Sequence, residues 1–222
     1  MPKTKLLIIG AGCHGASVAE AAELSGAFEV LGFLDDALPV GTAVLNGAVL
    51  GSISDLSSLD HLDRYRATYN QTIVAVGNNA VREKITQQLV DAGFDIAIVI
   101  HPRAFVSPSA VVDSGSVVMA GAVVETQALL GLGSIVNCGA ALDHHARVED
   151  FGHLGVNASM AGGALLGRGA WMQAGAALGY GVEIPAGVTL APGKAVEGKT
   201  NKYKNEKCFR SGLGTRGISH HG

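Results

Sequence analysis

The chain has 222 residues, enough for two modest domains, and 48% of them are apolar while only 16% are charged. The formal net charge of -3, with no basic patch before the C-terminal tail, argues against nucleic acid as a partner. No apolar run reaches the roughly 20 residues of a membrane span, and the N-terminus does not read as a signal peptide. Cys13, Cys138 and Cys208 show no paired spacing, so we expect a reducing compartment, the cytoplasm.

Residues 1–101 alternate between strand-like and helix-like segments, which predicts a parallel sheet with right-handed crossovers. His101-Pro102 marks the end of this Rossmann-like α/β domain, because the residue before a proline does not continue a helix. The expected strands are 5–9, 29–34, 48–50, 72–76 and 95–100, and the expected helices are 17–24, 55–62 and 80–92.

A glycine-rich turn follows the first expected strand. Gly10, Gly12 and Gly15 form a G-x-G-x-x-G motif, which lets a diphosphate approach the backbone at the start of a helix. Asp35 or Asp36, about 20 residues further on, is placed to bond a sugar hydroxyl or a base N–H. Because the domain is short and no second nucleotide-binding half follows, we favour a nucleotide-linked ligand over NAD. A tight turn without a ligand is the alternative.

The next segment, residues 102–196, carries a hexapeptide repeat. From Val106 to Val196 every sixth residue is apolar, sixteen times without an insertion, and the residue four places later is small through Ala176. A period of six fits neither an amphipathic helix nor a half-buried strand. It predicts a parallel β-helix in which three hexapeptides make one coil of about 18 residues, stacked roughly 4.8 Å apart.

A cluster of polar residues lies midway along this repeat, without breaking its period. Asp143, His144 and His145 stand together, and His153 follows on the next face. A histidine on such a surface can act as a general base, because its pKa lies near working pH. One coil above His144 lies Gly162, whose backbone N–H could stabilise an oxyanion. Exposed histidines without a catalytic role are the alternative interpretation.

With these motifs the chain resembles a known family over residues 5 to about 195. It looks like the hexapeptide-repeat sugar acetyltransferases, which include bacillosamine and perosamine N-acetyltransferases and sialic acid O-acetyltransferase-like proteins. The residues that carry the resemblance are GAGCHG (10–15), GFLDD (32–36), VAVGNN (74–79) and LDHHARVEDFGH (142–153).

The resemblance implies a left-handed β-helix, a homotrimer and acetyl-CoA as co-substrate between neighbouring subunits, with no metal. It implies that His144 is the general base, that Gly162 donates to the oxyanion, and that His153 and Ala174 contact acetyl-CoA. The residues expected at the nucleotide-linked sugar are Gly10, Gly12, Cys13, His14, Asp35 and Asp36.

Two features depart from the family pattern. The family has an acidic residue after the base, where this chain has His145, which brings no negative charge. Asp143 could substitute, although adjacent residues of a strand point to opposite sides. The tail, residues 197–222, is basic in its first part, and we expect it to cap the last coil or to be flexible.

The preferred function is N-acetylation of a nucleotide-linked amino sugar, in which the amine attacks the thioester of acetyl-CoA directly. O-acetylation of a sialic acid is the first alternative, and a non-enzymatic nucleotide-sensing trimer is the second. A zinc site of His144, His145 and His153 is disfavoured because neighbouring histidines should diverge. For Trp171, the only tryptophan, we favour a packing role over a ligand contact.

Overall fold

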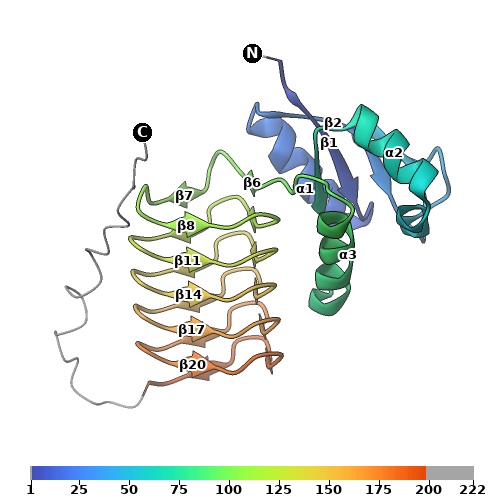
Figure 1. The fold of residues 1–222 in the computed structure, drawn as a ribbon. Helices are drawn as coiled ribbons and strands as arrows, with labels where there is room; N and C mark the ends of the chain where they lie inside the picture. The colour runs from blue at the N-terminus through green and yellow to red at the C-terminus, as the bar shows by residue number, and fades with distance from the viewer. Residues whose placement is uncertain (1, 199–222) are drawn as a thin grey trace, which may run out of the picture.

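The protein consists of an α/β domain that leans against one side of a β-helix. The computed structural model describes residues 2–198. The predicted cap or flexible tail (197–222) therefore lies almost entirely outside the described residues. Figure 1 shows the coils of the β-helix stacked as a prism, with α3 of the α/β domain running alongside it.

The α/β domain contains a five-stranded sheet in the order β3-β4-β2-β1-β5, which is parallel except for the β3–β4 hairpin. Its strands are β1 (Thr4–Ile9), β2 (Phe28–Leu34), β3 (Ala43–Val44), β4 (Gly47–Gly51) and β5 (Gln71–Val74). The helices are α1 (Cys13–Leu24), the short 3-10 helix η1 (Ile53–Ser57), α2 (Leu59–Thr68) and α3 (Asn79–Asp91).

The helices cover both faces of this sheet. Alternate strand residues such as Leu6 and Ile8 pack with α1, while Leu7 and Ile9 pack with α2 and α3. Helix α1 begins at Cys13, earlier than expected, directly after the extended N-cap residue Gly12. The single helix expected over 55–62 is instead η1 followed by α2, and the short strand β3 was not predicted from the sequence.

The β-helix is built from three parallel sheets of two-residue strands. The sheet nearest the α/β domain, called the docking sheet below, contains β6 (Val99–Ile100), β9 (Val117–Val118), β12 (Ile135–Val136), β15 (His153–Leu154), β18 (Trp171–Met172) and β21 (Thr189–Leu190). The second sheet contains β7 (Phe105–Val106), β10 (Val123–Val124), β13 (Ala141–Leu142), β16 (Ser159–Met160), β19 (Ala177–Leu178) and β22 (Ala195–Val196). The third sheet contains β8 (Val111–Val112), β11 (Leu129–Leu130), β14 (Arg147–Val148), β17 (Leu165–Leu166) and β20 (Glu183–Ile184).

The hexapeptide pattern explains the core of this prism. The apolar residue of each hexapeptide points inward, and Val136, Leu142 and Leu154 are fully buried. The small residue four places later, such as Ala140 or Ala146, is also fully buried, where the chain turns a corner. Each strand pairs with the strand 18 residues further on, as Leu142 does with Met160. The predicted left-handed β-helix after a Rossmann-like domain is confirmed.

The two domains share a continuous apolar core. The expected strand 95–100 is divided, because Ile96 bridges to Thr72 of the α/β sheet while β6 pairs with β9 of the β-helix. Outward residues of the docking sheet, Val99 and Val117, are buried in the same cluster as α1. The α/β domain is therefore fixed on one face of the prism, and this placement determines what each corner can reach.

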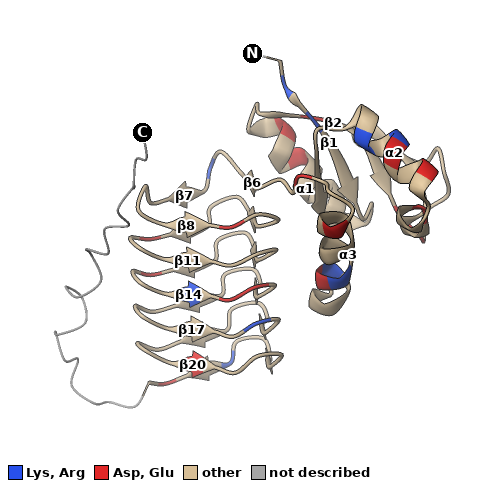
Figure 2. Cartoon of the chain, viewed as in Figure 1, with Lys and Arg blue, Asp and Glu red and all other residues tan. Residues whose placement is uncertain are grey.

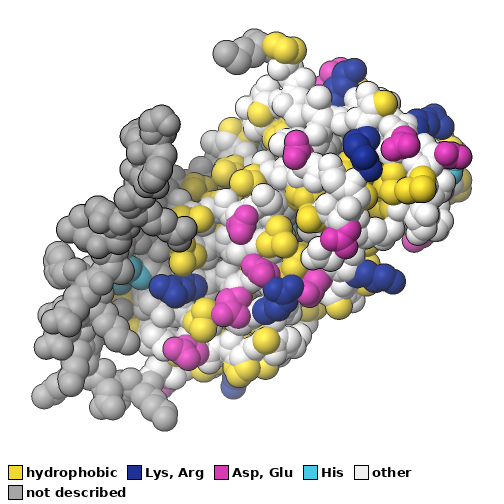
Figure 3. Space-filling model, in the orientation of Figure 1, with side chains coloured by type: hydrophobic (Ala, Val, Ile, Leu, Met, Phe, Trp, Pro, Cys, Tyr) yellow, Lys and Arg dark blue, Asp and Glu magenta, His cyan; other side chains and the backbone are white. Residues whose placement is uncertain are grey.

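Charged side chains lie mostly on the helices and turns, and few lie on the β-helix strands (Figure 2). Acidic and basic side chains are interspersed over the face drawn in Figure 3, which gives no field of a single sign there. Within residues 2–198, none of the helices is long and apolar enough to cross a membrane.

Candidate active site

His144 and His145 lie at the corner between the second and third sheets, called the histidine corner below (residues 143–146 and the stacked 161–164). Their Nδ1 atoms are 3.1 Å apart and their rings meet edge to face at 84°. The expectation that these side chains diverge is wrong, because they occupy a turn in which His145 has φ +59°, not a strand. The two rings therefore form a pair.

Asp143 contacts the predicted base in two ways. One carboxylate oxygen accepts a hydrogen bond of 2.7 Å from the backbone N–H of His144. The other lies 3.8 Å from Nε2 of His144. Asp143 and His144 do not point to opposite sides, as strand alternation predicts, because the chain turns here.

Gly162 lies directly against the ring of His144, one coil further on. A Cβ atom placed on Gly162 would be 2.5 Å from Cε1 and 2.6 Å from Nε2 of His144. The next residue, Gly163, donates its N–H to the backbone carbonyl of His144 at 3.0 Å. Only a glycine leaves room for the ring, and the predicted stacking of positions 144 and 162 is confirmed.

The glycine-rich turn is packed tightly against the neighbouring strand end. Gly10 has φ +105°, and a Cβ there would come within 2.9 Å of the carbonyl oxygen of Ala75. A Cβ on Gly15 would collide with the carbonyl of Gly10, whereas Gly12 has open space around it. Gly12 is exposed at the start of α1, with Cys13, an exposed free thiol, after it. This end of α1 is thus open to an anion.

Asp35 and Asp36 both brace the loops that border this turn. The Asp35 carboxylate accepts backbone hydrogen bonds from Ala11 at 2.7 Å, and from Ala37 and Leu38. Burial raises the pKa of Asp35, but these N–H groups hold it below its ordinary value. Asp36 accepts from the hydroxyl of Ser52 and from Ile53 N–H, at 2.5 and 2.9 Å. Both carboxylates therefore help to fix the loops beside the glycine-rich turn.

His14 and His153 lie together between the two domains. Burial and the nearby Arg82 lower the pKa of His14 to about 4. Burial, Arg82 and His14 lower the pKa of His153 to about 3, while a hydrogen bond to the Gly77 backbone opposes the shift. Nε2 of His14 and Nδ1 of His153 are buried and lack a hydrogen-bond partner among residues 2–198. Both rings are therefore uncharged at neutral pH and have a nitrogen available for a bound polar group.

Arg82 of α3 joins the domains, a role that was not predicted from the sequence. It is 1% exposed and donates to the carbonyls of Gly133 at 2.7 Å and Phe151 at 2.8 Å. Its other N–H groups donate to Val76 and to the side chain of Asn79. These acceptors carry no charge, and burial lowers the pKa of Arg82 to about 10.

Asn79 extends this contact to a third coil, because its amide donates to the carbonyl of Gly169 at 2.9 Å. Gly133, Phe151 and Gly169 occupy successive turns of the corner between the third and docking sheets, called the α3 corner below. Nearby, Arg168 pairs with Glu83 and Asp150 at 2.5 and 2.6 Å. No sequence signal marks Arg82, since its acceptors are backbone carbonyls of residues far along the chain.

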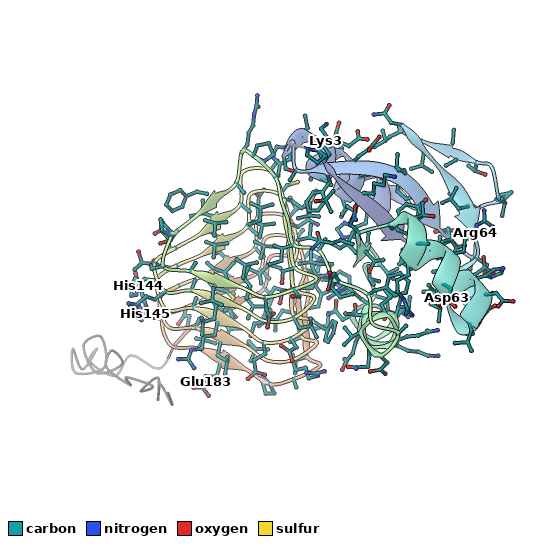
Figure 4. All side chains as sticks on the ribbon, turned by 45° about the horizontal axis from the view of Figure 1, so that its top comes forward. Lys3, Asp63, Arg64, His144, His145 and Glu183 are labelled. Carbon is teal, nitrogen blue, oxygen red and sulfur yellow. The ribbon has the colours of Figure 1, made fainter. Side chains whose placement is uncertain are left out.

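The predicted site residues fall into two groups on different sides of the β-helix. His153 belongs to the docking sheet and His14 of the glycine turn lies near it, while the histidine corner joins the two other sheets. Figure 4 shows His144 and His145 at the edge of the β-helix that faces away from the α/β domain. Ala174, expected to contact acetyl-CoA, is exposed in the turn after the docking-sheet strand β18. Within residues 2–198 no three His, Cys, Asp or Glu side chains are grouped to hold a metal.

Comparison with known proteins agrees with this architecture. Residues 5–89 match the family model described as the PglD N-terminal domain. Perosamine N-acetyltransferase from Caulobacter crescentus, solved with CoA and GDP-perosamine, is 33% identical over 86% of this chain and 88% of its own, with a TM-score of 0.79. The acetyltransferase domain of PglB from Neisseria gonorrhoeae FA1090, solved with acetyl coenzyme A, is 36% identical over 89% of this chain and 97% of its own, with a TM-score of 0.68.

A third structure, WeeI from Acinetobacter baumannii AYE, shares the fold at 19% identity over 86% of this chain and 94% of its own, with a TM-score of 0.59. The identity to the first two proteins, over nearly the whole of the described chain, confirms the resemblance found in the sequence. The chain therefore belongs to the hexapeptide-repeat sugar acetyltransferase family, and it is an acyltransferase with the left-handed β-helix of that family.

Proposed function

We propose that the protein transfers the acetyl group of acetyl-CoA to an amino group of a nucleotide-linked amino sugar. The amine nitrogen attacks the thioester carbonyl carbon, the new N–C bond forms and the C–S bond breaks. His144 takes the proton that the amine loses, and this proton then neutralises the departing CoA thiolate. No acyl-enzyme is required, so no cysteine takes part in the reaction.

The observation that carries this proposal is the contact between Gly162 and the ring of His144. A base that is held against a backbone unit, at an exposed corner, is the arrangement needed to deprotonate a nucleophile beside an oxyanion. His144 is 40% exposed, so a substrate can reach it. Nδ1 of His145 contacts Nδ1 of the His144 ring, and the Asp143 carboxylate accepts a hydrogen bond from the backbone N–H of His144.

The glycine turn supports a nucleotide-linked substrate. The open space around Gly12 at the start of α1 suits a diphosphate, and Asp35 braces that turn through Ala11. The relative from Caulobacter crescentus was solved with GDP-perosamine and CoA, and the one from Neisseria gonorrhoeae with acetyl coenzyme A. For this chain we assign the co-substrate role to acetyl-CoA, with His153 and Ala174 beside it.

We further propose that the working unit is a homotrimer in which His144 of one subunit serves the nucleotide-binding loops of its neighbour. Within one chain the two groups of residues lie on different sides of the β-helix, so one chain alone does not bring them together (Figure 4). The product, an acetamido sugar on a nucleotide, is an activated unit for glycan synthesis. We place the reaction in the cytoplasm, in keeping with the free thiols of Cys13 and Cys138.

The test follows CoA thiol release from acetyl-CoA with UDP-, GDP- and dTDP-linked amino sugars and with free and CMP-linked sialic acids. We expect turnover of one nucleotide-linked amino sugar and a loss of about 10²- to 10⁴-fold in kcat for His144→Ala. His61→Ala is the matched control, since His61 on α2 is similarly exposed, at 46%. Turnover of sialic acid alone would show that the acceptor is a hydroxyl. Full activity of His144→Ala would show that His144 is not the general base.

A further inference from the structure

A pocket of about 460 Å³ lies where the amino end of α3 overhangs the lower coils of the docking sheet. It is formed by the loop after β5 and by two neighbouring strands of that sheet, β18 and β21. The residues that line it are Gly77, Asn78, Asn79, Ala80, Gly169, Trp171 and Thr189. Neither the base nor the glycine turn belongs to this set, so the pocket adds a separate surface to the site.

Trp171 forms the aromatic wall of the pocket. One face of its indole is stacked on His153, with ring centroids 5.3 Å apart and planes inclined by 16°. His153 belongs to the preceding coil, and the following coil places the small, exposed Thr189 opposite Trp171. The indole therefore has one covered face and one face toward the pocket. Because the pKa of His153 is about 3, the stacked pair is uncharged at neutral pH.

The pocket adjoins the glycine turn at the same edge of the α/β sheet. Strand β5 is the neighbour of β1, and a Cβ on Gly10 would touch the carbonyl of Ala75, just after β5. Asp35, after β2 on the other side of β1, is bonded to Ala11 of the turn. Ligands of open α/β sheets lie along the carboxyl ends of the strands, where the diphosphate sits at a helix start.

This strand order assigns a place to each part of an elongated ligand. A nucleoside would lie near the ends of β2 and β4, its diphosphate would lie at the start of α1 after β1, and the group beyond the diphosphate would cross the end of β5. That last position opens on the pocket under α3. The first-turn N–H groups of a helix point out of its amino end, so Asn79 and Ala80 can present donors to hydroxyl groups.

We propose that this pocket is the sugar subsite, in which the apolar face of the hexose ring packs against the open face of Trp171. The inference rests on the proposed function and deepens it by naming the surface that recognises the sugar. A pyranose ring presents C–H groups on one face, which suit an aromatic platform, and Thr189 is small enough to leave space for the ring. Trp171 is then a specificity residue that contacts substrate.

Trp171 is the only tryptophan in the chain, so tryptophan fluorescence reports on the immediate surroundings of this one side chain. The full-length protein is titrated with the amino-sugar nucleotide that supports turnover, with the same nucleoside diphosphate lacking the sugar, and with CoA. We expect the sugar nucleotide to shift the emission maximum and to reduce quenching by acrylamide about twofold or more. The nucleoside diphosphate should compete for binding without that change. An equal change with the nucleoside diphosphate, or a change with CoA only, would overturn the assignment.

Two substitutions test the pocket through kinetics. Thr189→Ile keeps a β-branched residue but fills the space beside Trp171, and Thr189→Ser is its matched control. We expect Thr189→Ile to raise KM for the sugar nucleotide about tenfold with KM for acetyl-CoA unchanged. Trp171→Leu should also raise KM for the sugar nucleotide, and it removes the stack on His153, so its KM for acetyl-CoA should change as well. Trp171→Phe should recover most of the loss. Because Thr189 is exposed, its variants test the subsite even if Trp171→Leu does not fold.

The two hypotheses fail in different ways. If a sugar nucleotide is acetylated normally by Thr189→Ile and leaves Trp171 fluorescence unchanged, the subsite is wrong and the acetyltransferase function stands. If no member of the substrate series is acetylated by the wild-type protein, the proposed function is overturned and the sugar subsite with it.

Discussion

The reactivity of His144 depends on the absence of one methyl group one coil away. Gly162→Ala would bring a Cβ to within 2.5 Å of the imidazole, so the ring must move. A displacement of the base by about 1 Å is expected to reduce kcat by roughly 10- to 100-fold with little change in KM for the sugar nucleotide. Steady-state kinetics check this result.

The neighbouring Gly163 supplies the control for that substitution. It has φ +68° and no atom within 4 Å of a Cβ, so Gly163→Asn, whose side chain tolerates this backbone, should leave kcat nearly unchanged. In a His144→Ala background, Gly162→Ala should no longer cost stability, because the clash is gone. A stability loss that persists there would show that Gly162 is needed for the coil itself.

His145 combines a ring contact with a left-handed backbone. His145→Ala removes the Nδ1 contact of 3.1 Å and should lower kcat about tenfold, because the orientation of the base is no longer held. His145→Asn keeps an acceptor and tolerates φ +59°, so it should recover most of the activity. Equal kcat values for His145→Ala and the wild-type protein would show that the contact between His144 and His145 has no role in catalysis.

At the scale of elements, α3 is held on the prism by a buried guanidinium. Arg82→Met would leave the carbonyls of Gly133 and Phe151 buried without their donor, at about 1–3 kcal/mol for each. We expect a loss of about 2–6 kcal/mol in the free energy of unfolding, the sum for these two carbonyls. Arg168→Met breaks exposed ion pairs at the same corner and should cost at most about 1 kcal/mol. Urea denaturation compares the two, and equal losses would contradict a special role for Arg82.

The junction between elements also sets the response to acid. The folded pKa values of His14 and His153, about 4 and about 3, lie below the ordinary value of 6.5. As the pH falls, the unfolded chain therefore binds these protons first, so stability is full above about pH 6.5 and declines toward pH 4. At pH 5 the loss is up to about 2 kcal/mol for each histidine. When both histidines are replaced by glutamine, the denaturation midpoint should vary less with pH across this range. An unchanged dependence of the midpoint on pH would contradict this assignment.

At the scale of the whole molecule, the division of the site between subunits can be tested by complementation. Gly12→Asp fits the open space at the start of α1 but repels a diphosphate, while His144→Ala lacks the base. Each variant alone should be inactive. Mixed trimers should recover about a quarter of wild-type activity, the fraction of sites that receive both intact halves from neighbouring subunits. No recovery in co-expressed, co-purified mixtures would place the whole site in one chain.

The sequence alone predicts the hexapeptide register, the stacking of Gly162 on His144 and the glycine turn between β1 and α1. These features are local, because a six-residue period decides which side chain points inward without reference to the rest of the chain. The other features depend on contacts that form only when the chain folds. Arg82 meets Gly133 and Phe151 because stacking brings corners 18 residues apart into line. The pairing of His144 with His145 depends on a turn rather than a strand. The pocket at Trp171 exists because α3 overhangs a coil that is distant in sequence, and no pattern in the chain encodes a contact between surfaces that meet only after both domains have folded.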